Sequence, residues 1–169
     1  AMEGGLRIPM VVAGPGISPG THSYAHVWGA DLLPTIADLA GGLAFLPDSL
    51  DGGSFKSALL GGKGVEVTRS VDGMAFHVPY RNKIALNRPH SAWISGNHKL
   101  LYFHDDGEVR LFNLEDDCGE TRNLATALPL KAEAMKDGLF SYLNAVSAPR
   151  WQEGITWKGE PFSTYESTH

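Results

Sequence analysis

The first part of the chain changes from a continuous apolar run to a helical period. The run from Ile8 to Ala13 ends at Gly14-Pro15-Gly16, and a short apolar run bounded by Gly and Pro is typical of a strand buried on both faces. Apolar residues then recur at helical spacing between Asp31, a predicted N-cap, and Gly41, a predicted stop. These apolar positions are Leu32, Leu33, Ile36, Leu39 and Ala40. The pattern predicts strand, loop and helix.

From Val65 onward the apolar positions alternate, which is typical of antiparallel strands with one face exposed to solvent. Asp-Gly and Gly-Asn pairs between the strands indicate tight turns. The predicted strands are residues 65–70, 74–80, 91–95, 98–103 and 109–114. A helix predicted over 130–146 carries an apolar stripe that would cover this sheet. The stripe comprises Ala134, Met135, Leu139, Tyr142 and Leu143.

The fold class is therefore predicted as α/β passing into α+β. The expected parts are a strand-loop-helix unit at 1–64, an α+β subdomain at 65–148 and an aromatic tail at 149–169. The Gly-rich stretch 42–64 suggests a surface connection between the first two parts. A short helical turn is expected within it, around residues 55–60.

Composition narrows the function classes. The chain has 169 residues, of which 43% are hydrophobic, enough for a core of its own. Its net charge of −5, without a basic run, argues against nucleic acid as a partner. No apolar run reaches the length of a membrane span, and the first residues do not form a signal peptide. A single cysteine excludes a disulfide framework within a monomer.

An ordered set of segments lies at residues 3–9, 31–41, 50–52, 96–100 and 111–125. In this order they resemble the last quarter of a sulfatase, in the alkaline phosphatase superfamily. Residues 96–100, Gly-Asn-His-Lys-Leu, are similar to the family's late strand, usually Gly-x-Tyr-Lys-Leu. Residues 111–125 are similar to its closing hairpin, with Cys118 in the place of a usual Pro. The earlier matching segments are 3–9, 31–41 and 50–52. Their shared order over residues 3 to 146 identifies the chain as similar to the C-terminal region of an arylsulfatase-like protein.

The resemblance also implies what the chain lacks. Family members use a formylglycine nucleophile beside a calcium ion, with Lys and His residues that stabilise the oxyanion and protonate the leaving alcohol. All of these groups would lie upstream of the matching segment. No catalytic residue, metal ligand or cofactor is therefore assigned to this chain. Calcium and formylglycine are expected only in a full-length parent, which would be periplasmic or secreted if it is like typical bacterial sulfatases.

Two other groups of residues have the spacing or the residue types of a functional site, but a simpler explanation is preferred for each. Cys118 and Arg122 have the spacing of the formylglycine motif, but Glu120 occupies the position of its Pro, so an inert turn cysteine is preferred. His98, His104, Asp105 and Asp106 are typical metal-ligand types. However, His98 and His104 lie about 20 Å apart on an extended strand. We expect no metal site there.

Five basic residues are candidates for a substrate pocket: His22, His26, His77, Arg81 and His90. The first two lie on the loop after the predicted strand, where sites form in doubly wound sheets. The others flank a Pro-containing connection in the sheet and can attract an anion. Ordinary solvent-exposed side chains are the alternative for all five. The tail residues Trp151, Trp157, Phe162 and Tyr165 either line a sugar or aryl pocket or anchor a loose terminus.

Two functional hypotheses follow. In the first, the chain is the C-terminal part of a sulfatase-like hydrolase, inactive alone because its partner, the N-terminal catalytic part, carries the chemistry. In the second, it is a binding module that forms homo-oligomers through the unpaired apolar strand, since exposed strand edges are normally paired or covered. Neither hypothesis identifies the ester cleaved or the alcohol released.

Overall fold

A computed structural model describes residues 1–61, 66–81 and 88–151. The chain forms two compact units. Unit 1 comprises residues 1–8 and the chain from Gly73 onward, and unit 2 comprises residues 9–72. Each is described by itself. The predicted domain boundaries at 64 and 148 stay predictions.

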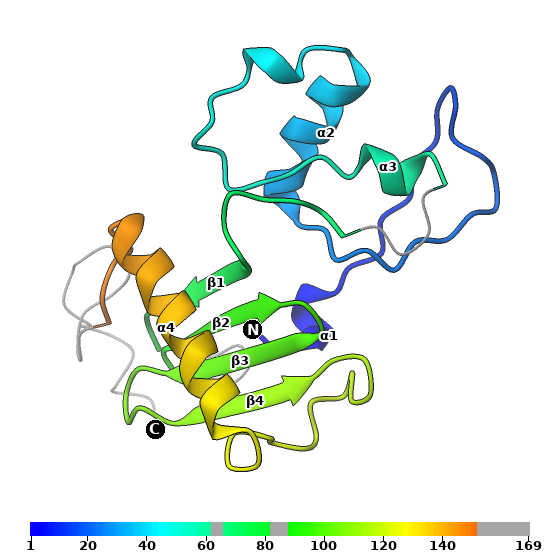
Figure 1. Cartoon of the computed structure of the whole chain (residues 1–169). Helices are drawn as coiled ribbons and strands as arrows, with labels where there is room; N and C mark the ends of the chain where they lie inside the picture. The colour runs from blue at the N-terminus through cyan, green and yellow to red at the C-terminus, as the bar shows by residue number, and fades with distance from the viewer. Residues whose placement is uncertain (62–65, 82–87, 152–169) are drawn as a thin grey trace. The chain divides into compact units, whose positions relative to one another are not determined.

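Unit 1 is built on a four-stranded antiparallel sheet in the order β1-β2-β3-β4 (Figure 1). Its strands are β1 (Met74–Val78), β2 (His90–Ser95), β3 (His98–Phe103) and β4 (Val109–Asn113). Gly96 and Gly107 have φ values of +53° and +77°, which glycine adopts without steric cost, at the two predicted turns. The last four predicted strands are thus confirmed. The first is wrong, because residues 66–70 are not a strand and β1 pairs with β2 instead.

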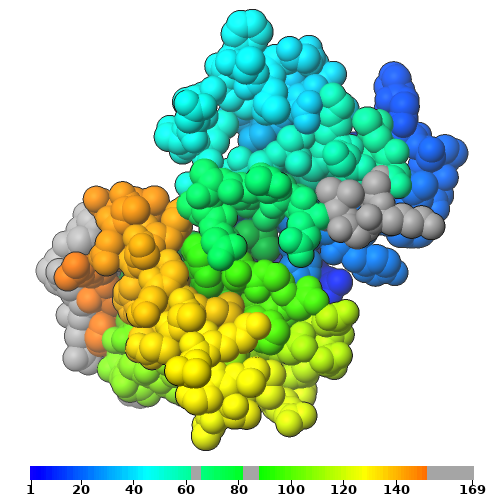
Figure 2. Space-filling model, in the orientation of Figure 1, coloured from blue at the N-terminus to red at the C-terminus, as the bar shows by residue number. Residues whose placement is uncertain are grey.

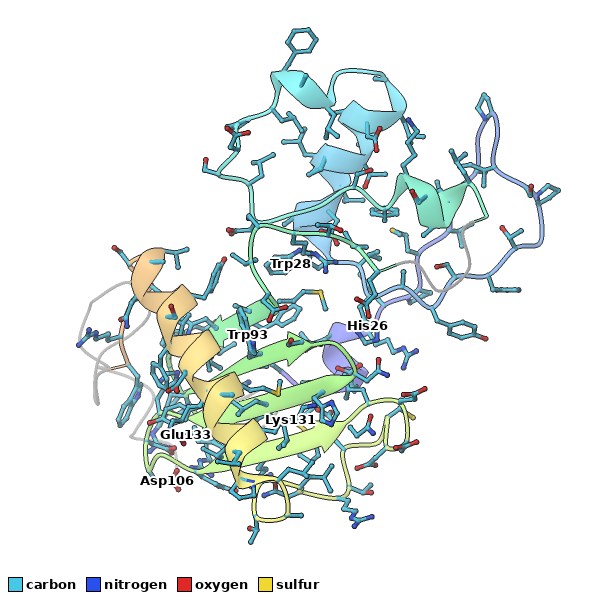
Figure 3. All side chains as sticks on the ribbon, viewed as in Figure 1. His26, Trp28, Trp93, Asp106, Lys131 and Glu133 are labelled. Atoms are coloured by element: carbon cyan, nitrogen blue, oxygen red, sulfur yellow. The ribbon has the colours of Figure 1, made fainter. Side chains whose placement is uncertain are left out.

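Helix α4 (Pro129–Ala145) covers one face of this sheet, as its predicted position required (Figures 1 and 2). Trp93 on β2 lies beside the helix (Figure 3) and packs in the same core as Leu139. Ala134 is exposed, so its predicted place in the apolar stripe is wrong. The buried helix positions follow the i, i+3, i+7, i+11 spacing of one helical face. They are Ala132, Met135, Leu139 and Leu143.

The opposite face of the sheet is buried as well, which corrects the prediction of a solvent-exposed face. Short helix α1 (Glu3–Leu6) supplies Glu3 to a pair with the fully buried Lys99 of β3. Arg88 lies 4.1 Å above the Phe103 ring. The alternation of polar and apolar residues misled the prediction because Lys99, although charged, is an inward position. The buried residues on this face include His90, Ala92, Ile94, Leu101, Phe103 and Phe112.

Unit 2 contains α2 (Leu32–Leu39) and α3 (Lys56–Leu59), with the 3₁₀ turns η1 (Gly29–Asp31) and η2 (Leu43–Phe45). The predicted helix at 31–41 and the helical turn near 55–60 are thus confirmed. Asp31 occupies the N-cap position of α2, as predicted, but its carboxylate makes no cap hydrogen bond to the helix. Instead it accepts hydrogen bonds from Arg69 at 2.7 and 2.9 Å and from the Gly53 amide at 2.9 Å.

The sharpest correction in unit 2 concerns the predicted buried strand at residues 8–13. No described residue pairs with this segment, which is irregular and exposed. Val11 is 92% exposed and Ile8, the adjoining residue of unit 1, is 78% exposed. A strand needs neighbouring strands to satisfy its N–H and C=O groups, and the described residues supply none. The apolar pattern is therefore real, but its partner is missing from the described structure.

Candidate functional site

A cavity of about 360 Å³ opens in unit 1, between the sheet and the C-terminal end of α4. His77 of β1 and His104, which follows β3, form its polar wall. Phe140 and Leu143 of α4 form its apolar wall, together with Trp151 of the segment after the helix. The remaining lining residues are Asn144, Ala148, Pro149 and Arg150. Its volume is in the range of small-molecule sites.

The two histidines are joined through the fully buried Ser91 of β2. His77 Nδ1 lies 2.6 Å and His104 Nε2 lies 2.7 Å from Ser91 Oγ. His77 Nε2 lies 2.7 Å from the carbonyl oxygen of Pro149, which can only accept. His77 Nε2–H therefore donates to this carbonyl oxygen. Ser91 Oγ thus links Nδ1 of His77 to Nε2 of His104.

The electrostatics of this site favour the neutral form of His104. Burial lowers the pKa of His104 to about 4, and the neighbouring His77 acts in the same direction. The His77 and His104 rings meet edge to face with centroids 5.4 Å apart. No carboxylate lines the cavity, and Arg150 is the one Lys or Arg among its described lining residues.

Of the five predicted pocket residues, only His77 lines this cavity. Arg81 lies 3.6 Å from Asp105, to which it is paired. His90 is buried on the other face of the sheet, where its ring contacts the nitrogen of Ala1, and burial lowers its pKa. His22 and His26 are exposed on the loop of unit 2. A role for any of the five in substrate binding stays a prediction.

Sequence reasoning missed Ser91, and it considered His104 only as a metal ligand. A buried serine inside an alternating strand carries no signal of its own. The signal that exists is the cross-strand register, in which His77 and Tyr102 flank Ser91 on either side. That register places residues distant in sequence on one face, and the turn lengths alone do not determine it.

A second polar cluster, on the opposite face, involves Lys99 with Glu3 and Glu120. Lys99 Nζ lies 3.0 Å from Glu3 Oε1 and 2.8 Å from Glu120 Oε1. The Glu3 amide also donates to Glu120 Oε2 at 2.6 Å. The cluster joins three of the segments that carry the sulfatase resemblance, and we interpret it as structural because all its members are paired inside the fold.

The remaining sequence candidates are not part of a site in the described structure. Cys118 is exposed in a turn, as predicted. Within residues 1–61, 66–81 and 88–151, no group of three or more His, Cys, Asp or Glu is arranged to hold a metal ion. None of the helices among those residues is long and apolar enough to cross a membrane. Trp151 lines the cavity, whereas Trp157, Phe162 and Tyr165 lie outside the described residues.

Comparison with protein families decides which fold this is. The model of the family described as N-sulphoglucosamine sulphohydrolase, C-terminal, matches residues 1–146. The chain belongs to this family. It is thus the C-terminal region of a sulfatase, as the ordered motifs indicated, and the resemblance covers the sheet, α4 and unit 2.

The individual relatives that match this chain are also described as sulfatases. The chain is 32% identical over 139 residues to a sulfatase of Formosa agariphila and 37% identical over 125 residues to a choline-sulfatase of Rhizobium meliloti. These matches include 75% and 73% of this chain but only 24% and 22% of the relatives. An arylsulfatase K of Xenopus laevis is 27% identical over 96% of this chain and 32% of its own length. The chain thus spans about a quarter to a third of these three relatives.

Solved structures show the same fold. A putative sulfatase from Bacteroides thetaiotaomicron superposes with a TM-score of 0.58 at 23% identity, covering 80% of this chain and 29% of that protein. The putative sulfatase yidJ from Bacteroides fragilis gives 0.55 at 17% identity, with 79% and 28% covered. At this identity the likeness shows the fold alone.

Proposed function

We propose that this chain is the C-terminal part of a sulfuric ester hydrolase, which completes the fold of a catalytic part and supplies none of the nucleophile or calcium chemistry itself. The observation that carries the proposal is the family match over residues 1–146, with relatives three to four times longer. The resemblance puts the formylglycine and calcium ligands in the catalytic part. The described residues hold no cluster suited to calcium, so no step is assigned to that ion.

The surface of unit 2 supports this proposal. The apolar side chains of α2 that its sequence predicts to be buried are exposed, with Ile36 at 63% and Leu33 at 53%. The segment 8–13 exposes Met10 and Val11 in the same way. Contiguous exposed apolar groups on a soluble protein usually mark an interaction surface. A parallel sheet in the catalytic part would accept 8–13 as a strand and cover α2.

Self-association is the second candidate, favoured by the same exposed segment. Two copies can pair their 8–13 segments and shield each other's α2. The two candidates differ in the expected solution mass and in what covers the exposed apolar side chains of unit 2. Light scattering on the 169-residue chain distinguishes them. We expect a monomer if the chain is the C-terminal part of a hydrolase, and a dimer or larger assembly if it self-associates.

The decisive experiment is a chimera. In the Rhizobium meliloti choline-sulfatase, the region matched by this chain is replaced by residues 1–146, and hydrolysis of choline sulfate is measured with calcium present. We expect the chimera to fold and to retain measurable turnover, and we expect the 169-residue chain alone to show none.

A matched pair of variants tests whether unit 2 is the docking surface. Ile36→Asp in the chimera places a charge on the proposed interface and should abolish soluble, active enzyme. Lys136→Asp, on the exposed face of α4, should leave activity intact. An active Ile36→Asp chimera would contradict docking through α2, and turnover by the isolated chain would contradict the assignment of the chemistry to the catalytic part.

A further inference from the structure

The cavity of unit 1 has a composition suited to one class of ligand. Its walls carry two aromatic rings, Phe140 and Trp151, and one permanent charge, Arg150. No Asp or Glu is among the lining residues. Arg150 is exposed, and within the part of the chain that the structure describes no carboxylate pairs with it. A cation beside aromatic walls is suited to bind an anion attached to a ring.

The segment that carries Arg150 and Trp151 is held in place by hydrogen bonds on both sides of the cavity. The Ala148 amide donates to the Leu143 carbonyl at 2.8 Å, which ties the segment to α4. His77 Nε2 donates to the Pro149 carbonyl, which ties it to the sheet. Ser147, the residue before Ala148, has φ = +52°, a left-handed conformation that is costly outside glycine. The chain thus turns sharply and returns over the cavity, instead of continuing away from α4.

The end of α4 does not oppose an anion as strongly as a free helix terminus would. The last carbonyls of a helix carry partial negative charge. Here the carbonyls of Tyr142, Leu143 and Asn144 accept hydrogen bonds from the amides of Val146, Ala148 and Ser147 respectively. Asn144 of the last turn adds a side-chain amide that can donate to a ligand oxygen.

From this geometry we propose that the cavity binds a six-membered ring compound bearing one anionic group. Arg150 pairs with the anion, Trp151 and Phe140 contact the ring, and the chain His104–Ser91–His77 fixes the wall opposite α4. The volume of about 360 Å³ accommodates a monosaccharide acid or an aryl acid. The two kinds of compound share a ring and one anionic group, and the probes below distinguish between them. The proposal uses residues of unit 1 only and does not depend on hydrolase activity.

The test is calorimetric titration of the 169-residue chain with matched probes. Glucuronate is compared with glucose, benzoate with benzyl alcohol, and inorganic sulfate is titrated alone. We expect saturable binding of at least one ring acid, at least about tenfold tighter than its neutral partner, because a charge-assisted hydrogen bond is lost in the neutral compound. Preference for glucuronate or for benzoate identifies the sugar or the aryl source.

Variants localise the binding. Arg150→Gln should weaken the ring acid about tenfold or more and leave the neutral compound unchanged. Trp151→Ala should remove the preference for a ring acid over inorganic sulfate, and Trp151→Phe should restore it. The control is Arg122→Gln, on the exposed loop after β4, which should bind as the unaltered chain does.

Three results obtained with the unaltered chain would overturn the proposal. They are equal binding of acid and neutral probes, sulfate binding as tight as that of the ring acids, and the absence of saturable binding in the millimolar range. A loss in Arg122→Gln equal to that in Arg150→Gln would also overturn it, since net charge alone would then explain the effect. Unchanged melting temperatures for the variants exclude misfolding as the cause. Turnover by the chimera described above is measured separately, so failure of this site and failure of the hydrolase proposal are distinguishable.

Discussion

The two units of this chain contain similar apolar residues, but unit 1 buries most of them and unit 2 leaves many of them exposed. In unit 1 the sheet is buried on both faces, and Leu100, Leu111 and Leu139 are completely inaccessible to solvent. In unit 2 the leucines of α2 are about half exposed, and Val11 is almost fully so. Burial of apolar surface is the main favourable term in folding. Unit 1 buries its apolar surface between its own sheet and helices. Unit 2 has the apolar pattern of a buried element, but many of its apolar side chains remain exposed.

Unit 2 nevertheless has a specific polar centre. Asp31 is completely buried and accepts hydrogen bonds from the Arg69 guanidinium and from two backbone amides, those of Trp28 and Gly53. A side chain on Gly52 could not be accommodated, because a Cβ there would lie 2.0 Å from the Ala30 carbonyl oxygen. Unit 2 is therefore shaped by polar contacts and close backbone approach. Its apolar face is left for another surface.

Among the variants considered, Lys99→Met in unit 1 is expected to lower the free energy of unfolding the most. The substitution leaves the carboxylates of Glu3 and Glu120 buried without their cation, which typically costs about 3–5 kcal/mol. Urea unfolding followed by tryptophan fluorescence, to which the buried Trp93 contributes, measures the loss. The control, Lys136→Met, removes an exposed pair with Glu133 and should change stability by less than about 0.5 kcal/mol. A similar small loss for Lys99→Met would show that the cluster is not needed for the fold.

Leu139→Ala tests the core beneath α4. Leu139 is completely buried against Trp93 and Leu100, so the substitution should cost about 3 kcal/mol through lost burial and the cavity that remains. The midpoint of urea denaturation should fall without a change in slope. An unchanged midpoint would mean that α4 contributes little to the stability of unit 1.

A pH effect is expected at His104. Its folded pKa of about 4 lies below the ordinary value of 6.5, so between these values the unfolded chain binds more protons than the folded one. Stability contributed by this group is therefore present above about pH 6.5 and is lost as the pH falls toward 4. An NMR titration of the imidazole resonances gives the folded pKa directly. A value at or above 6.5 would contradict the burial of this ring.

The smallest effect is expected for Ile36→Ala in unit 2. Ile36 is 63% exposed, so little burial is lost, and the change in unfolding free energy of the isolated chain should be below about 0.5 kcal/mol. The same substitution in the chimera should cost much more if α2 is covered there. Thermal melting of both proteins provides the comparison. A loss of several kcal/mol in the isolated chain would mean that unit 2 buries this face without a partner.

Local pattern was sufficient to predict β1 to β4, their turns, α2 and α4, because each element has its own period and its own stop signals. The ordered motifs predicted the family, which the match over residues 1–146 confirms. The sequence could not place Lys99 inside, since an alternating strand with a charged residue is equally consistent with a solvated face. It also could not show that the predicted strand at 8–13 has no partner among the described residues, because pairing is a property of two segments.

The cavity depended on tertiary structure entirely. His77, Ser91 and His104 lie on separate strands or loops, and the register of β1 and β2 brings them within hydrogen-bond distance. Arg150 and Trp151 reach the same cavity through the left-handed turn at Ser147. The residue types around Ser147 do not predict this turn. The sequence by itself determined β1 to β4, α2, α4 and the family, because these follow from periods and motifs along the chain. Only the tertiary structure decided which polar groups meet, because that depends on pairing across the chain.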